Sequence, residues 1–190
     1  MFKNIKCNAL KLVVCGEGGV GKTSLIETFQ QGRFIHGTTM TIAVQFHIKK
    51  INLADSANDL ALQIWDLGGQ KQFLNMGVFK KYCTGAHAAM VCFDLSDLDT
   101  LEAIPQWINI LPAQIPKILV GTKRDMGESM KELVEPYLES FNFHGYIETS
   151  AKDNIKSVYE AFMELLRDIS LNKPDNSSLL VMENQIPKSV

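Results

Sequence analysis

A glycine-rich segment between an apolar run and a helical pattern is the strongest constraint on this 190-residue chain. The apolar run covers residues 10–15, and residues 16–23 read GEGGVGKT, which matches GxxxxGK[ST]. The residues that follow, LIETFQQ, are typical of a helix. In this context the glycines let backbone N–H groups converge on phosphate oxygens at a helix N-terminus. The sequence therefore predicts a phosphate-binding loop between a buried strand and a helix.

Two side chains of this loop have predicted ligand contacts. Lys22 can reach the β and γ phosphates of a nucleotide, and the Thr23 hydroxyl can ligate Mg²⁺. This motif by itself does not separate a GTPase from an ATPase or a nucleoside kinase.

A second motif, Asp66-Leu67-Gly68-Gly69-Gln70, ends the next strand of parallel type. A carboxylate there can hold Mg²⁺ through water, and the backbone N–H of Gly69 can reach a γ-phosphate. Gln70 is placed where its amide could orient a water for in-line attack. The alternative is a surface turn, because Asp-x-Gly-Gly is also good turn chemistry.

Two more motifs follow later strands, Thr122-Lys123-Arg124-Asp125 and Ser150-Ala151-Lys152. Together the four motifs, GxxxxGKT, DxxGQ, TKxD and ETSAK, resemble the Ras superfamily of small GTPases over about residues 8–171. The resemblance implies an α/β G domain of the P-loop NTPase class. Such a domain has a mostly parallel six-stranded sheet with one antiparallel strand, and helices on both faces.

The resemblance also implies roles for single residues. Asp125 would accept the guanine N1 and N2 hydrogens and reject adenine, which has no donors there. Lys123 would pack over the base, and the backbone N–H of Ala151 would meet guanine O6. Phe34 resembles the aromatic residue that stacks on the base, and Thr41 the switch I threonine that completes Mg²⁺. A core phenylalanine and a solvated threonine are the alternatives for the last two.

The implied nucleotide-binding residues are Gly16, Gly18, Gly19, Val20, Gly21, Lys22, Thr23, Ser24, Phe34, Thr41, Gly69, Thr122, Lys123, Asp125, Ser150, Ala151 and Lys152. The implied catalytic residues are Lys22, Thr41 and Gln70, and the implied Mg²⁺ ligands are Thr23, Thr41 and Asp66.

Features of several branches of the superfamily are mixed in the chain. Residues 41–46, TIAVQF, resemble the Rab TIGVxF segment, and Trp65 is also Rab-like. Tyr82 would complete the Rab hydrophobic triad with Phe46 and Trp65 if switch II carries about two extra residues. These rings would then form an effector surface, and the alternative is that they pack in the sheet edge and core. Thr122 in place of asparagine is Rho-like, and WDLGGQ is similar to Arf and septation GTPases.

Apolar patterns predict the remaining elements. Residues 41–53 and 60–67 should form a long hairpin, and residues 88–93, 117–120 and 146–147 further strands. A helix is expected over residues 100–111, kinked or delayed by Pro105, and residues 128–141 should form one kinked helix or two short ones because of Pro136. One face of a closing helix carries the apolar stripe Ile155, Val158, Phe162, Leu165, Leu166 and Ile169. We expect a G domain over residues 1–171 and a tail over 172–190, with a docking turn at 179–182.

Composition and charge bear on partners and location. Lys+Arg 19 against Asp+Glu 21 gives a net charge of −2, which supplies no basic field for nucleic acid. The four cysteines, at positions 7, 15, 83 and 92, lack metal-ligand spacing and are expected to be reduced core thiols. The sequence shows no signal peptide or membrane-spanning run, residue 2 is phenylalanine rather than glycine, and no cysteine follows Cys92. We therefore expect a cytoplasmic, monomeric protein without a lipid anchor, which would reach membranes through a partner.

The sequence predicts a GTP-hydrolysing switch that works with effectors, an exchange factor and a GTPase-activating protein. Because Arg33, the nearest candidate for a catalytic arginine, is expected to be solvated, turnover should be slow, about 10⁻⁴ s⁻¹, until a partner supplies an arginine. A nucleotide kinase is disfavoured because the chain has three arginines and none clusters. A scaffold that binds guanine nucleotides without cycling is the alternative.

Overall fold

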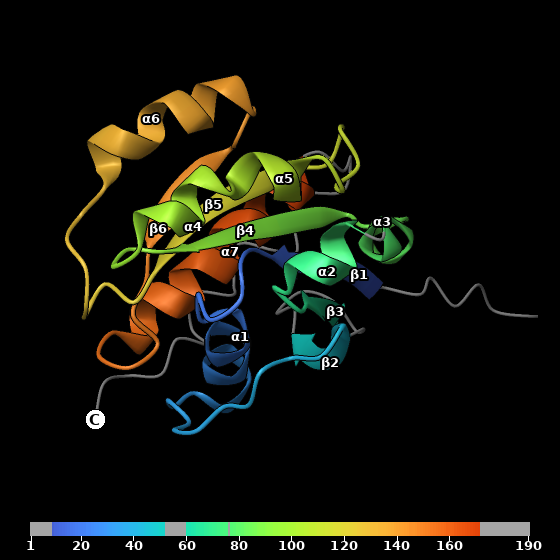
Figure 1. Ribbon diagram of the computed structural model, residues 1–190. Helices are drawn as coiled ribbons and strands as arrows, with labels where there is room; N and C mark the ends of the chain where they lie inside the picture. The colour runs from blue at the N-terminus through green and yellow to red at the C-terminus, as the bar shows by residue number, and fades with distance from the viewer. Residues whose placement is uncertain (1–8, 52–59, 76, 172–190) are drawn as a thin grey trace, which may run out of the picture.

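A six-stranded sheet with the order β2-β3-β1-β4-β5-β6 forms the centre of the computed structural model, which describes residues 9–51, 60–75 and 77–171 (Figure 1). Its strands are β1 (Ala9–Cys15), β2 (Val44–Ile51), β3 (Leu60–Leu67), β4 (Ala88–Asp94), β5 (Lys117–Thr122) and β6 (Gly145–Glu148). Neighbouring strands are parallel except β2 and β3, which are antiparallel. The predicted sheet, with one antiparallel strand, is confirmed.

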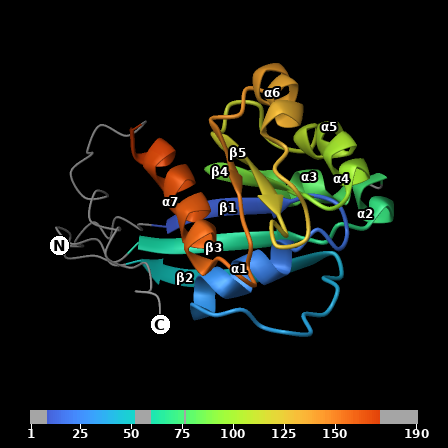
Figure 2. The same ribbon diagram turned by 90° about the vertical axis from the view of Figure 1, so that its left-hand side faces the viewer.

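Helices cover both faces of this sheet (Figure 2). One face packs against α1 (Lys22–Gln31) and α7 (Ile155–Leu171). The other carries α2 (Lys71–Asn75), α3 (Val78–Cys83), α4 (Leu98–Glu102), α5 (Ile104–Ile108) and α6 (Lys131–Ser140). Side chains alternate along a strand, so Leu12 and Val14 of β1 enter the first core and Val13 and Cys15 the second. Because both faces are covered, residues 12–15 of β1 are all apolar and buried, whereas Lys11 nearer its start is half-buried.

The apolar stripe of α7 packs as predicted. Val158, Phe162, Leu165 and Leu166 are buried, and Phe162 stacks on Phe29 of α1 with ring centroids 3.8 Å apart. The Ile169 side chain lies outside the described part of the structure. Residues 172–190, including the predicted turn at 179–182, also lie outside it, so the division into domain and tail remains a prediction.

The segment before β2 differs from the prediction. The strand begins at Val44 rather than at Thr41, and Ala43 has a φ of 61°. Thr41 turns inward, where its hydroxyl meets Thr23 and Asp66, so residues 41–43 leave the extended geometry of the strand. The other end of the predicted hairpin, residues 52–59, lies outside the described residues.

Prolines act differently in the two predicted helices. Residues 100–111 do not form one helix, because α4 ends at Glu102 and α5 begins at Ile104 with Pro105 in its first turn. A proline is tolerated there since the first N–H groups of a helix have no intrahelical partner. Pro136, in contrast, lies inside a single helix, α6. Its ring is exposed, so water can solvate the carbonyl that loses its hydrogen bond.

Two short helices, α2 and α3, are not predicted by the sequence pattern. They have five and six residues, which is too short for a helical repeat to show. Gly77, with a φ of 66°, precedes α3, which buries Phe79 and Cys83. These helices follow Gln70 directly and therefore belong to the predicted switch II.

The described cysteines are buried thiols, as the sequence predicts. Cys15, Cys83 and Cys92 are buried and unpaired, and burial raises the pKa of Cys83 to about 11 and that of Cys92 to about 12. Cys7 lies outside the described residues. In the described residues, every helix is too short or too polar to cross a bilayer.

Lys49 of β2 should stabilise the end of α1. Its ammonium group donates to the carbonyls of Phe29 and Gln30 at 2.8 and 3.3 Å and lies 4.7 Å from the Phe29 ring centroid. We expect Lys49→Met to lower the free energy of unfolding by about 1–2 kcal/mol in urea denaturation. The neighbouring exposed Lys50→Met is the control and should change it by less than about 0.5 kcal/mol. Equal effects of the two changes would contradict this role.

Candidate functional site

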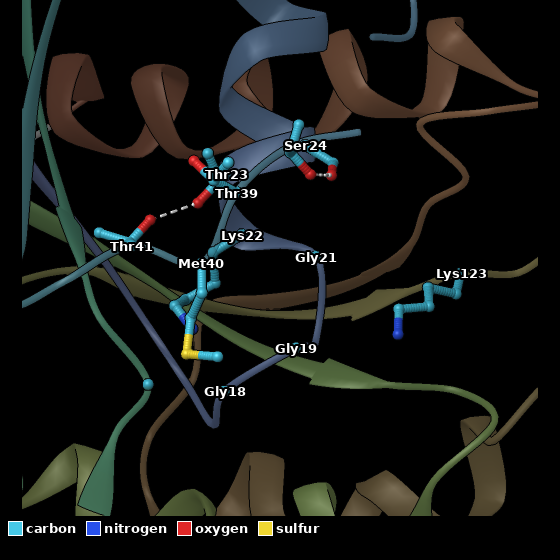
Figure 3. A pocket seen from close by; sticks show the side chains of 12 residues that line it. Gly18, Gly19, Gly21, Lys22, Thr23, Ser24, Thr39, Met40, Thr41 and Lys123 are labelled. Carbon is cyan, nitrogen blue, oxygen red and sulfur yellow. Dashed lines mark hydrogen bonds between the residues drawn. The ribbon is translucent and has the colours of Figure 1, made fainter. Parts of the chain in front are cut away.

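A cavity of about 370 Å³ opens where β1 passes into α1 (Figure 3). It is lined by Gly18, Gly19, Gly21, Lys22, Thr23, Ser24, Thr38, Thr39, Met40, Thr41, Gly69 and Lys123. The structure thus brings most of the predicted phosphate and Mg²⁺ residues together. Thr38, Thr39 and Met40 were not predicted to line it, although they belong to the threonine-rich loop that ends at Thr41.

The phosphate-binding loop is held in shape by glycines and by Lys22. Gly21 has a φ of 97° and begins α1, and a Cβ at Gly16 would overlap the carbonyl of Cys92. The Lys22 ammonium donates to the carbonyls of Gly16 and Glu17 at 2.8 and 2.7 Å. Burial lowers the pKa of Lys22, and the negative charge of Asp66 partly opposes this shift. This buried cation is therefore directed across the loop.

Thr23 and Thr41 line one wall of the cavity, and the buried Asp66 carboxylate lies directly behind them. The Thr23 hydroxyl donates to Asp66 Oδ2 at 2.6 Å and lies 2.8 Å from the Thr41 hydroxyl, which donates to the same oxygen at 3.2 Å. Figure 3 shows Thr23 and Thr41 facing each other. The register Val14↔Asp66 between β1 and β3 sets the carboxylate beside the loop.

This oxygen cluster has the chemistry of a Mg²⁺ site. Asp66 is fully buried and its Oδ1 has no hydrogen-bond partner, while burial raises its pKa. A hard cation would satisfy that orphaned oxygen and favour the charged carboxylate. The described residues contain no group of three His, Cys, Asp or Glu side chains suited to a metal. The one carboxylate and two hydroxyls of the cluster fit Mg²⁺, which uses one or two carboxylates and completes its shell with phosphate and water.

A second cavity, of about 230 Å³, lies next to the first and contains the predicted base contacts. Phe34, Lys123, Asp125, Ala151 and Lys152 line it, together with Gly21, Ser24, Leu25, Met126 and Thr149. The Ser150 hydroxyl donates to Asp125 Oδ1 at 2.6 Å and orients that carboxylate. Phe34 is half-buried against His36, with ring centroids 4.8 Å apart.

Asp94, which sequence reasoning missed, supports this second cavity. Its Oδ2 accepts from the Lys123 ammonium at 2.6 Å, and Lys123 has a φ of 56°. Burial alone would raise the pKa of Asp94, but hydrogen bonds from Lys123 and Ser96 lower it overall. The sequence does carry a signal for Asp94, because it is a carboxylate at the end of a buried parallel strand, the same pattern that identified Asp66.

Thr122 and Val20 lie behind the cavities rather than on their walls. Thr122 is buried, and its hydroxyl donates to the carbonyls of Val20 and, at 2.8 Å, Phe93. The residue at the asparagine position of the motif therefore ties the phosphate-binding loop to β4.

The Gly68-Gly69 pair lets three segments approach closely. The Gly68 N–H donates to the Ala43 carbonyl at 2.7 Å, and a Cβ at Gly68 would lie 2.6 Å from the Thr41 carbonyl. A Cβ at Gly69 would overlap the backbone of Gly18. Any side chain here would push switch II away from switch I or from the loop.

Gln70 does not line the described cavities in this structure. Its side-chain amide donates to the sulfur of Met40 at 3.2 Å, which links the two predicted switches.

The three rings of the predicted hydrophobic triad lie together at the surface. Trp65 is 5.3 Å from Phe46 and 5.9 Å from Tyr82 between ring centroids, and the Lys11 ammonium lies 4.3 Å from the Trp65 ring. Phe46 is 47% exposed and Tyr82 36%, whereas Trp65 packs against the core beneath α2 and α3. The triad therefore forms across β2, β3 and α3.

Comparison with known proteins gives one family. The Ras family profile matches residues 11–171. Ras-related protein Rab-32 of Homo sapiens is 35% identical over 189 residues, covering 94% of this chain and 81% of the relative. Rab-1C of Dictyostelium discoideum is 30% identical, covering 87% and 83%, and Rab-19 of Bos taurus is 29% identical, covering 84% and 74%.

Asp66→Asn tests whether the oxygen cluster is built for a cation. Because the folded state raises the pKa of Asp66, an ionised Asp66 lowers stability as pH rises through that pKa, unless a cation is bound. In EDTA at pH 7.5, Asp66→Asn should melt at or above the wild-type temperature in a thermal shift assay. Added MgCl₂ with GDP should raise the melting temperature of wild type by more than that of Asp66→Asn. If Asp66→Asn melts below wild type by the same amount in both buffers, the role of Asp66 is purely structural.

Proposed function

The chain belongs to the Ras family of small GTPases, and we propose that it is a molecular switch that binds GTP or GDP with Mg²⁺ and hydrolyses GTP slowly. The main observation behind this proposal is that the Thr23 and Thr41 hydroxyls, on the wall of a cavity that the phosphate-binding loop and Lys22 also line, both donate to the Asp66 carboxylate behind them. A loop for phosphates and an oxygen cluster for a cation occur side by side.

Guanine recognition is assigned to the second cavity. Asp125 presents an acceptor oriented by Ser150, and Lys123, held by Asp94, packs beside it. A carboxylate pairs with the N–H donors of guanine and leaves adenine unsatisfied, so the site discriminates strongly.

Lys22, Thr23 and the loop amides hold the phosphates. The Lys22 ammonium has three N–H donors, of which two are used by the carbonyls of Gly16 and Glu17, so one is left to donate to a phosphate oxygen. Thr23, Thr41 and Asp66 would hold Mg²⁺, which neutralises charge on the phosphates when bound. Lys22 then stabilises the charge that develops during phosphoryl transfer.

Gln70 is proposed to orient the attacking water. To do so its amide must leave the sulfur of Met40, a weak acceptor that a water or phosphate oxygen can replace. Among the described residues that line the two cavities there is no arginine. Slow intrinsic turnover follows, and a GTPase-activating partner would supply the missing cation.

Switching follows from the contacts of Thr41 and Gly69. A γ-phosphate would hold both, and its loss would release switch I and switch II. Because Phe46 and Trp65 lie on the strands between the switches, and Tyr82 on α3, release would alter the triad. We assign effector binding in the GTP state to this surface.

The charge of this surface favours an acidic partner. The elements β2, β3, α2 and α3 contain one acidic residue, the buried Asp66, and five lysines: Lys49, Lys50, Lys71, Lys80 and Lys81. Lys49 contacts α1 on the other face of the sheet, and the other four lysines are exposed, although the whole chain carries a net charge of −2. An effector segment with apolar side chains flanked by Asp or Glu would complement these elements.

The second candidate is a guanine-nucleotide-binding scaffold that does not cycle. The observation that favours it is Gln70, whose amide donates to the sulfur of Met40 and which does not itself line the cavity. Measured turnover separates the two functions.

Purified protein should carry GDP or GTP, retain it in a Mg²⁺-dependent way and not bind ATP. In single-turnover assays we expect phosphate release at about 10⁻⁴ s⁻¹, reduced at least about tenfold in Gln70→Leu, which cannot orient water. Gln72→Leu, an exposed neighbour on α2, is the matched control. Bound GTP without release over a day would favour the scaffold.

Phe46→Ala and the pair Lys80→Glu/Lys81→Glu should reduce capture of GTPγS-dependent partners from source lysate at least about tenfold, without a lower melting temperature. Leu133→Ala, at a 54% exposed residue on α6, is the control and should keep full capture. If Phe46→Ala melts lower and capture persists, the ring is core packing rather than a partner contact.

A further inference from the structure

Glu17 is the second residue of the phosphate-binding loop, a position to which the motif assigns no chemistry. Its side chain is 12% exposed, and Glu17 is not among the residues that line the cavity beside the neighbouring glycines. The Trp107 indole N–H of α5 donates to its Oε1 at 3.3 Å. Its other oxygen, Oε2, lies 3.8 Å from the ammonium of Lys71. The carboxylate therefore bridges a buried ring and a switch II lysine.

The backbone of Glu17 meets switch II as well. Its carbonyl accepts from the Lys22 ammonium at 2.7 Å, and it lies so close to Gly69 that a Cβ there would overlap it. Gly69 and Lys71 flank Gln70 in the chain. Both neighbours of the glutamine are thus in contact with one loop residue.

Trp107, which donates to Glu17, is held in place by the core around it. Trp107 is fully buried, and its ring centroid lies 6.0 Å from that of Phe79 in α3, which is 6.2 Å from Phe73 in α2. A tryptophan that is packed on all sides and donates its N–H fixes the acceptor in place. Glu17 is anchored from the helix layer while its second oxygen remains directed at Lys71.

We infer that Glu17 is a positioning residue for GTP hydrolysis: anchored by Trp107, it holds Lys71 and so keeps the start of α2, with Gln70, beside the phosphate-binding loop. The inference rests on the proposed function, because it concerns the residue assigned to orient water. Glu17 touches no reacting atom in this scheme and acts through the position of Gln70. Its loss should lower the rate of hydrolysis and leave nucleotide affinity unchanged.

The expected effect is modest because the Lys71 side chain is 69% exposed. Exposed ion pairs are weak, so we expect Lys71→Met and Glu17→Gln each to lower the single-turnover rate about three- to fivefold. Glu17→Gln retains an oxygen acceptor for Trp107 and removes only the charge. The double variant should be no slower than either single variant, since both remove the same interaction.

The experiment measures single-turnover GTP hydrolysis and the affinities for GTP and GDP in the full chain. Gln72→Met, which introduces the same side chain one residue along α2, is the control and should hydrolyse at the wild-type rate. A wild-type or faster rate in Lys71→Met overturns the inference, and so does a double variant whose loss is the product of the single losses. Lys71 lies on the surface, so this arm stays informative if Glu17→Gln fails to fold.

Trp107 supplies a readout that a merely structural role would not move. The chain has two tryptophans, so a Trp65→Phe background leaves Trp107 as the fluorophore. Its emission should differ between the GDP and GTPγS forms, and Lys71→Met should reduce that difference at least about twofold. If the Trp107 emission is the same in the GDP and GTPγS forms, or if Lys71→Met keeps the full difference, Trp107 is not coupled to the nucleotide through Glu17 and Lys71.

Gln70→Leu run in parallel separates two kinds of failure. If Gln70→Leu slows hydrolysis and Lys71→Met does not, only the role of Glu17 is lost. If wild type does not hydrolyse GTP, or Gln70→Leu matches wild type, the proposed function of Gln70 fails first.

Discussion

The buried Asp66 carboxylate is the group on which the arrangement of the site depends. One of its oxygens joins Thr23 of α1 and Thr41 of switch I, while the other has no hydrogen-bond partner. Burying a charge is expensive unless it is paired, and Lys22 is the nearest buried cation. Burying the Asp66 carboxylate near the carboxyl end of β3 is therefore unfavourable for folding, and a bound cation would offset that cost. Such a conflict between stability and ligand chemistry is expected at a functional site.

Close backbone approach is the second constraint, and it couples the loops around the site to one another. Gly68 contacts switch I and Gly69 contacts the phosphate-binding loop, so the segment before α2 is wedged between them. Glu17 adds a side-chain contact from the loop to Lys71, and Trp107 ties that contact to the helix layer. A change at the phosphates would therefore reach switch I, switch II and the helix layer through contiguous contacts.

Prediction from the sequence was reliable where a pattern is local and strong. The Ras family assignment, based on four motifs, and the mixed sheet are confirmed. The start of β2 was wrong, because a hydroxyl contact with distant Thr23 and Asp66 overrode the strand pattern at Thr41. The helices α2 and α3 were too short to show a repeat, and the effect of Pro136 depended on its exposure to water.

The sequence alone determined the identity of the loop and the strand-to-helix context around it, because glycine spacing, Lys22 and Thr23 are contiguous in the chain. It also predicted that Phe46, Trp65 and Tyr82 would meet, on the condition of a longer switch II. The partners of Glu17, Asp94 and Gln70 were decided only by the tertiary structure. Glu17 and Trp107 are 90 residues apart, and no local pattern encodes a contact that exists only after β1 and β4 pair and α5 packs on them.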